Sequence, residues 1–139
     1  MNVKEVLNVL NKKSGVLGLS EVSSDFRDIT KAIEEGNEVA KNALEVFANT
    51  VVRFVGAYVA EMNGVDAIAF TAGVGENNQA VRKMVCEQLG YLGVSLDEKA
   101  NEKRREEIMI STPDSKVKVF VIPTNEELAI ARETLELLS

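Results

Sequence analysis

The spacing of apolar residues predicts helices over most of the first half of the chain. A helix is expected over residues 3–10, with Asn2 able to cap its start. The glycine-containing segment 14–20 breaks the pattern and is predicted to be a loop. A second helix is expected over residues 25–35, because Gly36 is a good terminator.

A long helix is predicted from Asn37 to about Met62. Apolar residues at spacings of three and four form one stripe along it: Ala40, Ala43, Phe47, Val51, Phe54, Tyr58 and Met62. A helix of this size is about 40 Å long, which is more than a small domain usually covers. Two interpretations remain open: a central core helix, or a helix that partly meets another subunit or domain.

The second half of the chain mixes strands with helices. Residues 66–70 form an apolar run that predicts a buried strand, followed by a glycine loop over residues 71–77. The next helix has Val81, Val85 and Leu89 facing inward, and Cys86 is expected to pack in or beside it. Later elements are a helix over 97–107, a short edge strand over 108–110, a stronger strand over 117–122 and a last helix from Thr124.

Strands that alternate with helices indicate an α/β fold with parallel pairing. Two strong strands are few, because a typical sheet has about five or six. We therefore expect one domain over residues 1–139 with a small, incomplete sheet, belonging to a larger protein whose other strands lie upstream.

Composition excludes several classes of function. The chain has 22 acidic and 16 basic residues, a net charge of −6, which argues against a nucleic-acid surface. Its one basic run, residues 103–105, is flanked by glutamates and is taken as locally cancelled. Without histidine, and with Cys86 as its only cysteine, the chain cannot build a Ser-His-Asp triad, a His- or Cys-based zinc site or an internal disulfide.

The chain has no pattern typical of a targeting signal at its start. Its longest apolar segments are interrupted by Glu45, Arg53 and Glu61, so we expect no membrane span. A cytoplasmic protein with neither a membrane nor a nucleic-acid partner is the expectation from composition.

Three segments could carry chemistry. Residues 73–77 follow a strand and precede a helix, which suits a phosphate or nucleotide. Spacing alone favours a mere tight turn, because the full dinucleotide and phosphate-loop motifs are absent. Near residue 124, Thr124 and Glu127 have capping-box spacing, while Glu126 either favours the helix dipole or helps to hold Mg²⁺. Residues 23–28 are either a capped helix start or a contact to a base or ribose.

Four motifs resemble the acetate kinase family, in the family's order and across essentially the whole chain: Asn11–Gly18, Ser23–Asp28, Phe70–Asn77 and Val121–Leu128. What they resemble is the C-terminal portion of that enzyme. The resemblance implies a helix-rich, partial ribonuclease H-like domain of the actin-like ATPase superfamily. It also implies a homodimer, and phosphoryl transfer between ATP and acetate to give ADP and acetyl phosphate.

The resemblance also implies roles for individual residues. The nucleotide would be contacted by Asp25, Phe26, Arg27, Gly73, Val74, Gly75, Glu76 and Asn77. Glu126 would bind Mg²⁺. The family's acetate pocket and catalytic residues lie in segments that this chain lacks, so no catalytic residue is assigned and turnover by this chain alone is not expected. Acetate or acetyl phosphate would bind only together with the N-terminal part.

Two alternatives stay open at this point. The chain could belong to a propionate or butyrate kinase, because the acyl pocket would lie in the missing part. It could also be a non-catalytic dimerisation module that binds no nucleotide.

Overall fold

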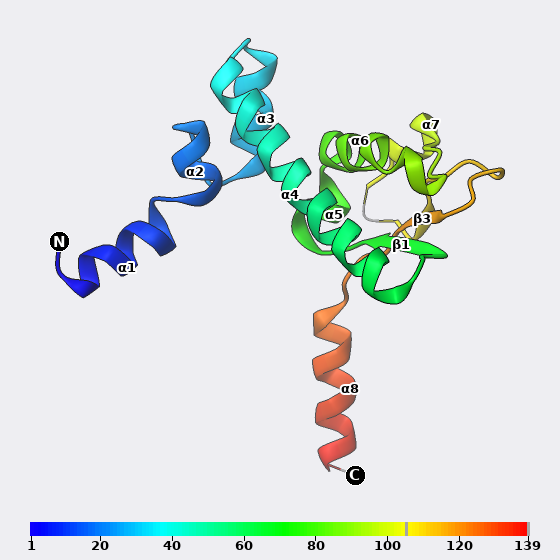
Figure 1. Ribbon diagram of the computed structural model, residues 1–139. Helices are drawn as coiled ribbons and strands as arrows, with labels where there is room; N and C mark the ends of the chain where they lie inside the picture. Colours follow the sequence, from blue (N-terminus) through cyan, green and yellow to red (C-terminus); the bar gives the residue numbers. More distant parts are fainter. Residues whose placement is uncertain (105, 139) are drawn as a thin grey trace.

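The structure of this chain is a computed structural model, in which residues 1–104 and 106–138 are described (Figure 1). Its elements are α1 (Val3–Lys12), α2 (Gly15–Ser20), α3 (Phe26–Glu34), α4 (Glu38–Met62), β1 (Ala67–Phe70), α5 (Ala72–Asn77), α6 (Gln79–Gln88), η1 (Gly90–Leu92), α7 (Glu98–Asn101), β2 (Ile108–Met109), β3 (Lys118–Val121) and α8 (Glu126–Leu138). Arg105, within the basic run and the predicted 97–107 helix, lies outside the described residues.

Side-chain caps set the helix boundaries that the sequence predicts in the first half. Asn2 and Glu5 form a reciprocal capping box at α1, with hydrogen bonds of 2.7 and 3.0 Å. Asp25 caps α3 and Asn37 caps α4, each by accepting a backbone N–H. Gly36 follows α3 with a φ of 86°, which confirms its role as a terminator.

The segment 14–20, predicted to be a loop, instead contains helix α2. Gly15 adopts a φ of 62°, which lets the chain turn between α1 and α2. Helix α2 contacts α4. The prediction was wrong because this tertiary contact outweighs the low helix propensity of two glycines in six residues.

Helix α4 is buried only in its first half, where Ala40, Ala43, Leu44 and Ala48 contribute to the core. Farther along the predicted stripe, Phe54, Tyr58 and Met62 are 60%, 57% and 62% exposed. Val51, Val52 and Val55 still pack, partly buried, against the core, so the core interpretation holds for one face of α4 as far as Val55. By length and composition α4 could cross a membrane, but a core helix can meet the same criterion, and α4 here contacts α2, α3 and α6.

The sheet has three strands in the order β1-β3-β2. Strand β1 pairs with β3 in parallel, as expected, whereas β2 is an antiparallel edge strand, so the sheet is mixed. Phe70 is buried, but Ala67 and Ala69 of β1 are exposed. The prediction of a fully buried strand was wrong, because β1 lies at an edge of the sheet with part of its surface open.

The core lies between α4, α6 and the sheet. Its buried members include Leu44, Val85, Leu89, Val119 and Val121. Cys86 is 2% exposed and belongs to this cluster, which confirms its packing role. Burial raises the pKa of its thiol to about 12, so this cysteine is a poor nucleophile near neutral pH.

Two predicted helix boundaries near the C-terminus were wrong. The helix expected over 97–107 ends at Asn101, because the carbonyls of Asn101 and Lys103 turn toward Arg82. The last helix starts at Glu126, where Asn125 caps it by accepting the N–H of Leu128. The predicted Thr124–Glu127 capping box is therefore not formed.

Helix α8 projects from the rest of the molecule (Figure 1). Every one of its residues is exposed, including the large apolar side chains Leu128, Ile130, Leu135, Leu137 and Leu138. Helix α1 likewise has no buried residue, so the architecture is a helix-rich α/β arrangement with a small mixed sheet and an exposed helix at each end of the described chain (Figure 1).

Candidate functional site: a cleft between two helices

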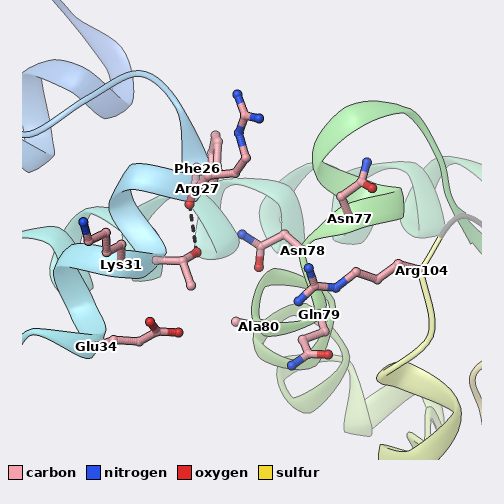
Figure 2. A pocket seen from close by; sticks show the side chains of 10 residues that line it. Phe26, Arg27, Lys31, Glu34, Asn77, Asn78, Gln79, Ala80 and Arg104 are labelled. Carbon is pink, nitrogen blue, oxygen red and sulfur yellow. Dashed lines mark hydrogen bonds between the residues drawn. The ribbon is translucent and has the colours of Figure 1, made fainter.

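A cleft of about 480 Å³ lies between α3 and the start of α6. Figure 2 shows the α3 side chains along one wall, Asn77, Asn78 and Gln79 along the other, and Arg104 reaching in from beyond α7. The lining residues are Phe26, Arg27, Thr30, Lys31, Glu34, Asn77, Asn78, Gln79, Ala80 and Arg104.

The cleft unites predicted site residues from two distant segments. Phe26 and Arg27 from the start of α3 line it together with Asn77 from the end of α5. Six other predicted residues do not line it: Asp25, Gly73, Val74, Gly75, Glu76 and Glu126. The geometry thus supports a shared site for two of the three candidate segments.

Asp25 and Phe26 hold in place the side of the cleft that α3 forms. The Asp25 carboxylate caps α3 and accepts hydrogen bonds of 2.6 to 3.1 Å from the Arg27 guanidinium. These bonds lower the pKa of Asp25 to about 2 and raise that of Arg27. The ring of Phe26 packs edge-on against Phe47 of α4, with ring centroids 4.7 Å apart.

The cleft combines positive charge with polar and aromatic groups. Lys31 and Arg104 contribute positive charge and Glu34 one negative charge, while the charge of Arg27 is paired with that of Asp25. Asn78 caps α6 by accepting the N–H of Val81, so the positive end of the α6 dipole also lies here. This combination suits an anionic ligand with a flat polar ring system, and a nucleotide has that chemistry.

The predicted glycine loop over residues 71–77 is largely a short helix, α5. It follows β1 through Ala72, which has a φ of 59°. A Cβ on Gly75 would lie 3.3 Å from the carbonyl carbon of Phe70, so packing against the end of β1 explains this glycine. Gly73 has no heavy atom within 4 Å of such a Cβ among those described, so the same packing does not explain it.

Arg82 supports this region and was missed in the sequence analysis. Its side chain is fully buried and donates hydrogen bonds to the carbonyls of Gly75, Glu76, Asn101 and Lys103 and to the Asn101 amide oxygen. Burial lowers the pKa of Arg82, and the positive charge of Arg104 lowers it further. The sequence pattern that could have indicated a buried arginine is its place next to Val81, on the inward side of an amphipathic helix.

The other missed residues belong to the cleft itself. Thr30, Lys31 and Glu34 follow the predicted Arg27 at spacings of three and four, which places them with it on one polar face of α3. Arg104 was dismissed with the basic run as cancelled by glutamates. Lys103 does pair with Glu106 at 3.4 Å, but Arg104 lines the cleft.

Glu76 connects the cleft region with the approach to α8. Its side chain is mostly buried, and Oε1 accepts hydrogen bonds from the Thr124 backbone N–H at 2.8 Å and the Thr124 hydroxyl at 2.6 Å. Two of the predicted segments, around residues 76 and 124, are therefore physically joined.

Glu126 is the first residue of α8 and is exposed. Among residues 1–104 and 106–138, no three or more His, Cys, Asp or Glu side chains gather as a metal site would require. One exposed carboxylate still fits Mg²⁺, because this ion is commonly held by one or two carboxylates together with substrate phosphates and water.

Residues 1–132 match the family model described as the acetokinase family. The chain is 61% identical over 138 residues to the acetate kinase of Lachnoclostridium phytofermentans, and 57% identical over 136 residues to that of Pseudothermotoga lettingae. These matches cover 99% and 98% of this chain, but only 35% and 34% of the two relatives. The chain thus spans about a third of the length of the curated relatives it matches.

Solved structures give the same result. A crystal structure of Porphyromonas gingivalis acetate kinase matches all of this chain with a TM-score of 0.92 and 46% identity, over 35% of its own length. A propionate kinase from Francisella tularensis matches 96% of the chain with a TM-score of 0.85 and 38% identity, over 34% of its own length. The extent of the family match, together with these similarities, establishes that the chain belongs to the acetokinase family.

Proposed function

We propose that this chain is the nucleotide-binding portion of an acetate kinase, which transfers a phosphoryl group between ATP and acetate and yields ADP and acetyl phosphate. The observation that carries the proposal is the cleft that joins Phe26 and Arg27 to Asn77. Family membership supports the reaction, since the curated relatives are acetate kinases.

The adenosine part of the nucleotide would lie in this cleft. Phe26 offers an aromatic surface and Arg104 offers positive charge. Arg27 and Asn77 also line the cleft, with side chains already held by Asp25 and by the Gly73 carbonyl. Asp25 would act by holding the Arg27 side chain, since the two form an ion pair of 2.6 Å. Residues 73–76 belong to the adjoining helix α5 and would border the ligand there.

Glu126 would hold Mg²⁺ near the nucleotide phosphates. When bound, the ion would neutralise negative charge on those phosphates. The contribution of this chain is the exposed carboxylate at the start of α8, where the positive end of the helix dipole also favours negative charge.

The chain alone is proposed to have no turnover. Phosphoryl transfer depends on positioning and on charges that stabilise the transferred group, and acetate would need a pocket of its own. In the resemblance drawn from the sequence, those groups lie upstream of this chain. The small sheet would then be one part of an actin-like ATPase domain.

Self-association belongs to the same proposal. The second half of α4 exposes Phe54, Tyr58 and Met62, and large exposed apolar side chains such as these favour contact with another surface. We propose a cytoplasmic homodimer that uses this part of α4.

A second candidate differs only in the acyl group. The match to a propionate kinase covers 96% of this chain at 38% identity, so another short-chain carboxylate is a defined alternative to acetate. The nucleotide-binding role of the cleft is the same in both cases.

Calorimetric titration of the chain with Mg-ADP tests the nucleotide role. We expect saturable binding, and Arg104→Ala should weaken it about tenfold because one favourable charge contact is lost. Arg132→Ala, which removes an exposed arginine from α8, is the matched control and should bind like the wild type. Absence of binding by the folded wild-type chain, or equal effects of the two substitutions, would refute the proposed site.

A further inference from the structure

Glu76 lies at the junction of two predicted site segments. Its neighbour Asn77 lines the cleft, while its own carboxylate accepts the two hydrogen bonds from Thr124. Glu76 is only 8% exposed, and a carboxylate this buried is costly unless hydrogen bonds or charges compensate it. The hydrogen bonds between Glu76 and Thr124 are therefore a stable part of the folded structure.

The backbone of Glu76 is held as firmly as its side chain. Arg82 donates hydrogen bonds of 2.9 Å to the carbonyls of both Gly75 and Glu76. The buried guanidinium thus fixes the end of α5 against α6, and it fixes the point from which the Glu76 carboxylate reaches Thr124.

The approach to α8 depends on this anchor. All residues of α8 are exposed, so packing along the helix does little to set its position. Thr124 is bonded to Glu76, Asn125 caps the helix, and Glu126 follows directly as its first residue. Only Asn125 separates Glu126 from the anchored Thr124, so a shift of Thr124 moves Glu126.

We propose that Glu76 and Thr124 are positioning residues that couple the nucleotide cleft to Glu126. The hydrogen bonds between them keep the Glu126 carboxylate at a fixed place relative to Asn77. Bound nucleotide therefore raises the affinity of the chain for Mg²⁺, and bound Mg²⁺ raises its affinity for the nucleotide. This increase is larger than the one that Mg²⁺–nucleotide association in water alone would give. This inference rests on the proposed function, because it needs both a nucleotide in the cleft and the metal role of Glu126.

The test measures the affinity of the 139-residue chain for ADP by calorimetry, with and without Mg²⁺. Thr124→Val removes the hydroxyl donor at nearly constant size. The enhancement by Mg²⁺ is the dissociation constant of ADP without Mg²⁺ divided by that with Mg²⁺. Thr124→Val should lower this ratio about fivefold. Affinity for ADP without Mg²⁺ should change less than twofold. Thr124→Ser keeps the hydroxyl and should keep the wild-type enhancement.

Glu76→Gln provides a second, independent route. It preserves the shape of the side chain but removes the charge, so it should reduce the enhancement in the same way. The double variant should lose less than the sum of the two single variants, because both substitutions weaken the same contact between residues 76 and 124. Melting temperatures confirm that each variant is folded.

The possible results separate the two proposals. A wild-type chain that binds ADP in neither condition refutes the proposed function and this inference with it. The inference alone fails if ADP binds but Mg²⁺ gives no enhancement, or if Thr124→Val leaves the enhancement unchanged. It also fails if Thr124→Val weakens binding equally with and without Mg²⁺, as a purely structural role would.

Discussion

At the scale of single residues, Asp25 determines both how α3 begins and where the Arg27 side chain lies. The Asp25 carboxylate accepts the backbone N–H of Arg27, a local cap that spans two residues. Its ion pair with Arg27, at 2.6 Å, depends on the side-chain orientation that the cap creates. One carboxylate therefore both caps α3 and orients the Arg27 side chain beside the cleft.

This ion pair predicts a pH dependence. The pKa of Asp25 falls from its ordinary value of 3.8 to about 2, chiefly through the hydrogen bonds from Arg27. A carboxyl group with a depressed pKa stabilises the fold above its unfolded pKa, and that contribution disappears as the pH falls toward the folded value. The melting temperature of the wild type should therefore be higher than that of Asp25→Asn at pH 5. The difference between the two melting temperatures should disappear as the pH falls toward 2.

Melting temperatures of both proteins between pH 2 and pH 6 check this expectation. A difference that stays constant over the whole range would mean that ionisation of Asp25 does not contribute to stability.

At the scale of helices and strands, boundaries set by local contacts can be predicted from the sequence, whereas boundaries set by residues far along the chain cannot. The boundaries set by Asn2 and Asn37 follow from caps within three residues, and sequence reasoning found them. The start of α8 has a local signal that was overlooked, since Asn125 accepts the N–H of Leu128 three residues on.

The end of α7 was misplaced because Arg82, far along the chain, binds the carbonyl of Lys103. Thr124 is likewise held by the distant Glu76. No local pattern records those contacts.

Arg82 connects several elements, and its removal should be costly. Arg82→Met leaves buried carbonyls at the end of α5 and after α7 without their donor. We expect a loss of about 3 kcal/mol in the free energy of unfolding, measured by urea denaturation.

Arg53→Met, on the exposed side of α4, is the matched control and should change stability by less than about 0.5 kcal/mol. Similar losses for the two substitutions would show that the Arg82 hydrogen bonds add little to stability.

At the scale of the whole molecule, the cleft arises where α3 meets the start of α6. The sequence analysis predicted nucleotide contacts on both sides, from Phe26, Arg27 and Asn77. It missed Lys31 and Arg104, because a basic side chain on a helix or in a charged run looks like any exposed residue. Their common location is a product of tertiary packing, which one sequence does not reveal.

The exposed half of α4 leads to a prediction about assembly. At micromolar concentration, light scattering should give a mass of twice the 15.2 kDa of one chain. The double substitution of Phe54 and Tyr58 by serine should shift the protein toward the monomer, because both side chains are more than half exposed and apolar.

Val3→Ser, on the distant helix α1, should leave the mass unchanged. A monomeric wild type would contradict the proposed homodimer.

The central claim is that a nucleotide occupies the cleft between α3 and α6. Its most direct test is a titration of the ¹⁵N-labelled chain with Mg-ADP, followed by amide chemical shifts in two-dimensional NMR spectra. We predict that the largest shifts fall in residues 26–34 and 77–80 and at Arg104, the segments that line the cleft. A folded sample whose spectrum does not change at millimolar Mg-ADP, or changes chiefly in α1 and α2, would contradict the account.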